Sequence, residues 1–183
     1  MNLEELKTNK GKLILVMLAV AAVARLIPHE PNFIPFGAIA LFAGTYLVNK
    51  RLAIVLPLCA MLLSDLLLEI ISGNGFHATL PFVYGSYILI AMLGFALRRR
   101  VQRQTIMVAS LTGSLIFFFV TNFGSWITYH DSYPFTLSGL MDCYIAGIPF
   151  FKGTVTGDLF YNLVVFGSYS LVRWKFPKLV LGN

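Results

Sequence analysis

The sequence predicts an all-α, polytopic membrane protein with six transmembrane helices and both termini in the cytoplasm. Of its 183 residues, 57% are hydrophobic and 12% are charged, with mean hydropathy +0.77, and a soluble core of this size could not bury so much apolar surface. The apolar residues form six continuous runs rather than the alternating pattern of a membrane β-barrel. Moreover, 12 of the 14 lysines and arginines lie before the first run, after the sixth run, or in alternate gaps between runs. The positive-inside rule places these segments in the cytoplasm.

The first three predicted helices are bounded by helix-breaking residues. The first helix, approximately residues 13–27, follows a lysine-rich start and ends at Pro28. The second, approximately 33–48, begins among prolines, which suit the first turn of a helix. The third, approximately 52–72, stops at Gly73. Because a crossing needs about 20 residues, the first two helices are expected either to cross with little tilt or to be extended by flanking residues.

The remaining three predicted helices surround the longest outer loop. The fourth covers approximately 81–97, the fifth 105–129 and the sixth 149–172. Within the outer loop, apolar side chains recur at helical spacing over 135–146, which predicts either an interfacial helix or a lid over a cavity. We find no internal repeat, so residues 1–183 are expected to form a single integral membrane domain.

Polar and ionisable side chains within these helices define a candidate site. A charge near the bilayer centre costs about 2.5–3.5 kcal/mol on insertion scales, so each such residue is a functional candidate. Spacing of four residues places Asn122 with Trp126, and Asp158 with Asn162, on shared helix faces. These groups predict a pocket that opens outward. The predicted substrate-binding residues are Asn122, Trp126, Asp158, Asn162, Lys152, Tyr87 and Glu69.

Internal charge pairing is the alternative explanation for the buried charges, because such charges are normally paired. Arg25 and Asp65 are the predicted structural pair; Asp65 is surrounded in sequence by leucines. Lys152 lies near the outer end of its helix, where its side chain could reach the membrane surface instead.

Several functional classes are disfavoured. The net charge of +6 is dispersed beside apolar runs, without the basic stripe of a nucleic-acid-binding protein. Cys59 and Cys143 show no metal-ligand or disulfide spacing. The sequence lacks a phosphate loop for ATP hydrolysis and the DxxD or HxxxH motifs of membrane enzymes. We therefore expect neither catalysis, nor a bound metal, nor a cofactor.

Small residues also recur at four-residue spacing, which predicts close helix–helix contacts or, in the run from Gly153 to Asp158, backbone exposed near a ligand. The pairs are Ala40 with Gly44, Ala109 with Gly113, and Gly153 with Gly157.

Short stretches of the chain carry a likeness to two families of membrane proteins. With the six-helix layout, the stretches from Phe36-Gly37-Ala38 through Ala43-Gly44 and at Ser64-Asp65-Leu66-Leu67 resemble the substrate-binding S components of energy-coupling factor (ECF) vitamin transporters. The stretches Asn32 to Ala38 and Gly157 to Tyr161 are similar to an uncharacterised bacterial family of six-helix membrane proteins.

The resemblance implies uptake of a vitamin or related micronutrient, bound from outside, at the bacterial cytoplasmic (inner) membrane. It also implies a separate energising module of ATPases and a transmembrane coupling protein. S components dock on this module through an Ala-xxx-Ala pattern in their first helix. The alanines here, at positions 19, 21, 22 and 24, lack that spacing, so a solitary transporter is a second possibility. The alternative function is a non-catalytic accessory or scaffold subunit whose polar residues face a partner helix.

Overall fold

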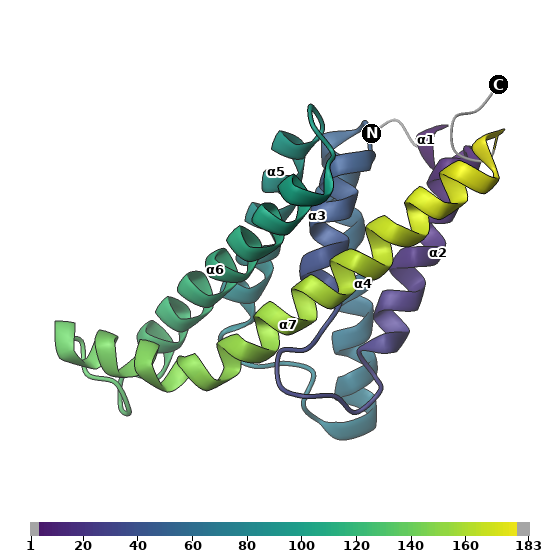
Figure 1. Ribbon diagram of the computed structural model, residues 1–183. Coiled ribbons are helices and arrows are strands. Elements are labelled where there is room, and N and C mark those ends of the chain that lie inside the picture. Colours follow the sequence, from purple (N-terminus) through teal and green to yellow (C-terminus); the bar gives the residue numbers. More distant parts are fainter. Residues whose placement is uncertain (1–3, 179–183) are drawn as a thin grey trace.

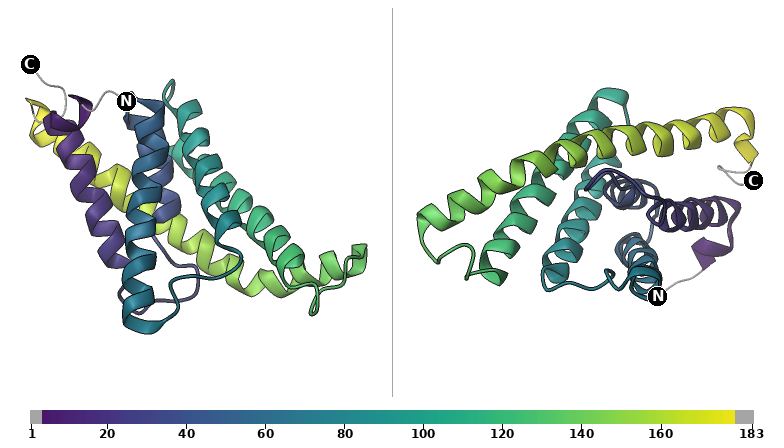
Figure 2. Two further views of the ribbon diagram at one scale, coloured as in Figure 1. Left: turned by 180° about the vertical axis from the view of Figure 1, so that it is seen from behind. Right: turned by 90° about the horizontal axis from the view of Figure 1, so that it is seen from below.

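The computed structural model describes residues 4–178, and these residues form an all-helical structure (Figure 1). The helices are α1 (Glu4–Lys7), α2 (Asn9–Ala24), α3 (Phe36–Tyr46), α4 (Lys50–Ser72), α5 (Leu80–Leu97), α6 (Arg103–Thr128) and α7 (Leu137–Lys175). The helix α1, the end of α7 and the α3–α4 and α5–α6 turns gather at one end, the basic end (Figures 1 and 2). Segments 25–35, 73–79 and 129–136 lie at the opposite end, the loop end.

Within the described residues, α4, α5 and α6 are long and apolar enough to cross a membrane. The helix α3 is apolar but shorter. Large apolar side chains cover much of the outer surface, among them Val20, Ile70, Val108 and Leu163. Such extensive apolar exposure is unusual for a soluble monomer and is compatible with a membrane environment.

The short helix α3 lies at the centre of the molecule. Every residue from Phe36 to Thr45 is buried, as expected for a helix that is apolar on all sides. A Cβ atom on Gly44 would lie 2.1 Å from the carbonyl oxygen of Ala91, and one on Gly94 2.4 Å from that of Leu41. Glycine at these positions therefore lets the backbones of α3 and α5 touch.

Two charged side chains hold the turn between α3 and α4. Arg98 donates to the carbonyl oxygens of Gly44 at 2.8 Å and Val48 at 3.3 Å. The carboxylate of Glu5 accepts from the backbone N–H groups of Val48 and Asn49 at 2.7 and 3.0 Å. A cation on the last carbonyls and an anion on the free N–H groups satisfy polar backbone that the helix ends leave unpaired.

The second predicted helix is shorter than expected because a turn precedes it. The N–H of Phe33 donates to the carbonyl of Glu30 at 3.0 Å, and Asn32 has a positive φ of 61°. Proline followed by asparagine with positive φ is typical of a type II turn. With Pro35 as the N-cap, α3 begins at Phe36 rather than at residue 33. The first predicted helix is also shifted: α2 covers Asn9–Ala24 rather than 13–27, because the Thr8 hydroxyl caps its start.

The predicted interfacial helix at 135–146 and the predicted helix at 149–172 are one continuous helix, α7. Pro149 lies inside it, and the helix changes direction in its first half (Figure 1). Proline bends a helix by removing one hydrogen bond and crowding the preceding turn, but it need not end the helix. The predicted separation of these two helices is therefore wrong.

Candidate functional site

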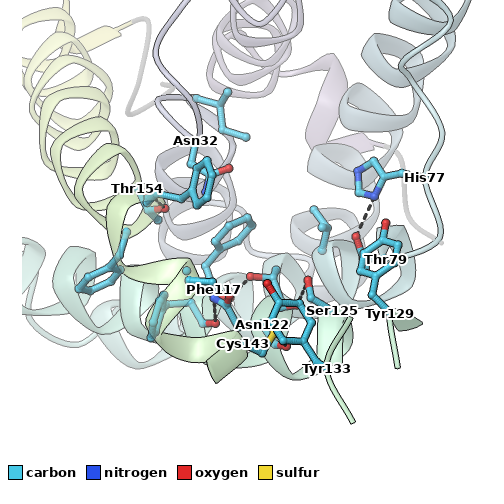
Figure 3. A pocket seen from close by; sticks show the side chains of 18 of the residues that line it. Asn32, His77, Thr79, Phe117, Asn122, Ser125, Tyr129, Tyr133, Cys143 and Thr154 are labelled. Atoms are coloured by element: carbon cyan, nitrogen blue, oxygen red, sulfur yellow. Dashed lines mark hydrogen bonds between the residues drawn. The ribbon is translucent and has the colours of Figure 1, made fainter. Parts of the chain in front are cut away.

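A cavity of about 450 Å³ opens at the loop end of the molecule (Figure 3). It lies among segment 25–35, the start of α5, the end of α6 and the first half of α7. Its volume falls within the range of about 300–1,000 Å³ typical of small-molecule sites. The polar side chains that line it belong to Arg25, Asn32, His77, Thr79, Thr121, Asn122, Ser125, Tyr129, Tyr133 and Thr154.

The wall formed by α6 presents hydrogen-bond acceptors. Thr121, Asn122 and Ser125 each donate to a carbonyl oxygen one turn earlier in α6, at 2.7, 2.8 and 3.0 Å. Their donors are therefore largely used within the helix. The side-chain oxygens keep lone pairs for groups in the cavity.

Asn122 also lies where α6 and α7 approach closely. A Cβ atom on Gly147 would fall 2.2 Å from Oδ1 of Asn122, so glycine leaves the space that this amide occupies. The Cys143 thiol donates to the backbone carbonyl oxygen of Asn122 at 3.3 Å. Figure 3 shows Asn122, Cys143 and Ser125 together on one side of the cavity, with Asn32 and Thr154 on another.

Arg25 connects the cavity to a buried polar cluster. Its Nη1 donates to the Asp65 carboxylate and, at 2.9 Å, to Oγ of Ser64. The Tyr84 hydroxyl donates to the other Asp65 oxygen at 2.6 Å. Asp65 is fully buried, whereas the Arg25 side chain is 13% exposed and lines the cavity. The structure thus brings Arg25 and Asp65 together, and adds Tyr84 to them.

Asp158 lies beyond the inner wall of the cavity, where α7 crosses α3 and α6. It is 6% exposed and accepts from the Ser114 hydroxyl at 2.6 Å. Its Oδ1 would be 2.1 Å from a Cβ atom on Gly37. Asn162, one turn further along α7, donates to Ser110 Oγ at 3.0 Å and to the Asp158 carbonyl at 2.8 Å.

Tyr87 contributes an aromatic ring to the same region. It is 4% exposed and packs between Phe36 and Phe117, with ring centroids 6.2 and 5.4 Å away. Phe117 lines the main cavity, so Tyr87 lies just behind that wall.

Of the seven predicted substrate-binding residues, Asn122 alone lines the cavity. Tyr87, Asp158 and Asn162 are buried outside it, and the other three make their contacts elsewhere. Trp126 donates from Nε1 to the Pro134 carbonyl at 2.9 Å and so holds segment 129–136. Glu69 accepts from the N–H groups of Gly75 and Phe76 at 2.9 and 3.1 Å, in the turn after α4. The side chain of Lys152 is exposed on α7. The structure does not assign these three residues to the cavity, because shared depth along helices does not fix the direction of a side chain.

Several cavity residues were not predicted as site residues. His77, Thr79, Tyr129 and Tyr133 come from the segments that join the helices, where periodicity gives no signal. Asn32 gave one signal, since Pro-Asn indicates a turn whose asparagine can adopt positive φ.

The family model described as "Family of unknown function (DUF6580)" matches residues 6–179. The chain belongs to this family. All residues that line the cavity of this DUF6580 member lie within the matched range. A search of the curated proteins and a search of the solved structures each find no match.

Proposed function

We propose that this protein is a transport protein of the bacterial inner membrane that binds a vitamin-class or other small micronutrient from outside. The observation that carries the proposal is the partly polar 450 Å³ cavity at the loop end, opposite the basic end. In this proposal α2 to α7 are the six membrane spans, and the positive-inside rule places the basic end in the cytoplasm. The cavity then faces the exterior.

The lining suggests the chemistry of the ligand. The α6 wall offers acceptor oxygens from Thr121, Asn122 and Ser125 to N–H or O–H groups of a ligand. Within the described residues Arg25 donates only through Nη1, which leaves its other N–H groups for a carboxylate or carbonyl oxygen. Aromatic rings, including Phe117, offer an apolar surface for a flat ring. A small ring compound with donors on one edge and an acceptor or anion on the other fits this lining.

Binding of a panel of radiolabelled vitamins to the purified protein tests the proposal. Thr121→Val removes a cavity hydroxyl, and Thr112→Val is the matched control. Both hydroxyls donate to the carbonyl four residues earlier in α6, at 2.7 and 2.8 Å, but Thr112 lies outside this cavity. Loss of a hydrogen bond of about 0.5–1.5 kcal/mol would weaken binding about two- to twelvefold in Thr121→Val alone. Failure of the folded protein to bind any compound would contradict the proposal.

The energy source is a separate part of the proposal. By its resemblance to S components, the protein would work with an energising module, and a solitary transporter is the other possibility. Vesicles that contain this chain alone distinguish them. Equilibration of a bound vitamin across the vesicle membrane would favour solitary transport, whereas binding without entry would favour a required module.

The alternative function, an accessory subunit of a membrane complex, is favoured by one observation. A mainly apolar groove of about 710 Å³ runs between α6 and α7 in the half nearer the basic end, and it reaches Trp174. A partner helix could pack there. A stoichiometric partner that copurifies with the chain, together with a cavity that binds no small molecule, would favour this alternative.

A further inference from the structure

Asp158 is a buried acid for which the described residues provide no positive partner. The inward-facing charges near the cavity are two acids and one base, Asp65, Asp158 and Arg25. Arg25 is paired with Asp65, and the hydroxyl of Ser114 is the donor to the Asp158 carboxylate. A hydroxyl dipole alone does not offset the desolvation of a carboxylate on a residue only 6% exposed. Asp158 therefore requires a proton or another cation.

A second, smaller cavity lies beside Asp158. Its volume is about 10 Å³, which suits a single water-sized particle. Four of the residues that line it carry side-chain oxygens: Asn32, Tyr87, Thr154 and Asp158. Gly37 also lines it, and a Cβ atom there would occupy the space 2.1 Å from the carboxylate. The absence of a side chain on Gly37 keeps the Asp158 oxygen open.

A further acceptor lies one helical turn away. Oδ1 of Asn162 is buried and has no hydrogen-bond donor within the described residues, although its Nδ2 donates twice. Buried acceptors normally have a partner. Asn162 does not line the small cavity, so its oxygen is not a ligand there; it adds a second under-compensated acceptor on the same face of α7.

We propose that Asp158, with the oxygens of Thr154, Tyr87 and Asn32, forms a binding site for one monovalent cation. The cation is either a proton on the carboxylate or a sodium ion in the small cavity, since oxygen ligands suit hard cations. This cation site does not depend on the identity of the ligand in the main cavity. The two cavities share Asn32, Ile34, Phe117 and Thr154 as lining residues, so occupation of one site can alter affinity at the other.

The other ionisable groups around the site are few. Tyr87 faces Asp158 from α5, while α3 and α6 present Gly37 and Ser114, which do not titrate. Arg25, just after α2, and Asp65, on α4, interact electrostatically with Tyr87, and they neutralise one another.

Thermal unfolding of the purified protein, without any vitamin, tests the site. The unfolding midpoint is measured against sodium chloride, with N-methylglucamine chloride maintaining the ionic strength, and separately against pH without sodium. A sodium site predicts a saturable rise of the midpoint with sodium. A proton site predicts no sodium effect and a midpoint that falls as pH rises, because deprotonation leaves a bare buried charge.

Asp158→Asn should abolish whichever response the wild type shows. Asp142→Asn removes an exposed carboxylate from the same helix and should retain the response. If Asp158→Asn does not fold, Ser114→Ala replaces it. Loss of the hydroxyl should change the sodium or proton concentration that gives half of the response by at least about threefold. An unchanged response in the folded Asp158→Asn protein, or in Ser114→Ala if only that protein folds, would overturn the proposal.

Discussion

Replacement of Arg25 by methionine tests the ion pair in the wall of the main cavity. Methionine retains an unbranched apolar chain but removes the charge and the donors to Asp65 and Ser64. The Asp65 carboxylate is fully buried and would keep only the Tyr84 hydroxyl, at 2.6 Å. Loss of one partner of a buried pair costs about 3–5 kcal/mol because the other charge remains desolvated. We expect a decrease of this size in the free energy of unfolding.

The reciprocal variant should be less harmful. Asp65→Leu leaves Arg25 without its carboxylate, but the Arg25 side chain is 13% exposed and lines the cavity, where water can solvate it. The double variant Arg25→Met/Asp65→Leu leaves no buried charge at this position. It should therefore be more stable than Arg25→Met alone, since replacement of both partners by apolar groups is often nearly neutral.

Reversible unfolding in mixed micelles measures all four proteins as a double-mutant cycle. We expect a coupling energy well above about 0.5 kcal/mol, the limit within which independent sites add. If the two single effects simply add, or if Asp65→Leu is the more destabilising variant, the assignment of Arg25 as the compensating charge is refuted.

Three further predictions use the same unfolding assay. Gly94→Ala should lower the free energy of unfolding by about 1–3 kcal/mol, because the added methyl group overpacks α5 against α3. Gly85→Ala, in open space on the same helix, should not destabilise by this mechanism. Equal losses in the two variants would contradict the close contact between α3 and α5. Trp126→Phe should cost about 0.5–1.5 kcal/mol through the lost bond to Pro134; unchanged stability would exclude a role in holding segment 129–136. Glu5→Gln should cost about 1–2 kcal/mol, because the amide keeps one acceptor oxygen and so loses one of the two backbone hydrogen bonds and the charge assistance of the other; unchanged stability would exclude a role in holding the α3–α4 turn.

The sequence predicted the helices best where local signals agree with packing. The bounds of α4 lie within two residues of expectation, because Asn49 caps its start and Gly73, with φ 66°, ends it. At α7 the predicted separation between residues 146 and 149 does not occur, because the helix continues through Pro149. The part before the proline packs on α6, where the Tyr144 hydroxyl donates to the Phe119 carbonyl at 3.0 Å. Sequence spacing does not show such a contact.

The sequence predicted how far along its helix each candidate residue lies, but not the direction in which its side chain points. Asn122 and Trp126 share a face of α6, yet only Asn122 lines the cavity, because the long indole reaches instead to the Pro134 carbonyl. The partner of the Asp158 carboxylate is the neutral hydroxyl of Ser114 rather than a cation. This pairing arises because α6 and α7 meet at Ser114, and sequence spacing does not show that contact. The tyrosines of segment 129–136 gave no periodic signal.

The shortness of α3, the prolines that precede it and the glycine pair of α7, Gly153 and Gly157, are structurally related. The short second helix and its preceding prolines leave segment 31–35 non-helical, and Gly153 and Gly157 lie against this segment rather than against another helix. A Cβ atom on Gly153 would lie 2.0 Å from the Pro31 carbonyl oxygen, and one on Gly157 3.0 Å from Cα of Phe33. Non-helical backbone is tolerated in a membrane protein only where protein buries it or a water-filled cavity meets it. The two glycines admit this backbone beside α7, and its Asn32 lines both cavities, so the interruption of the second helix is what builds the site.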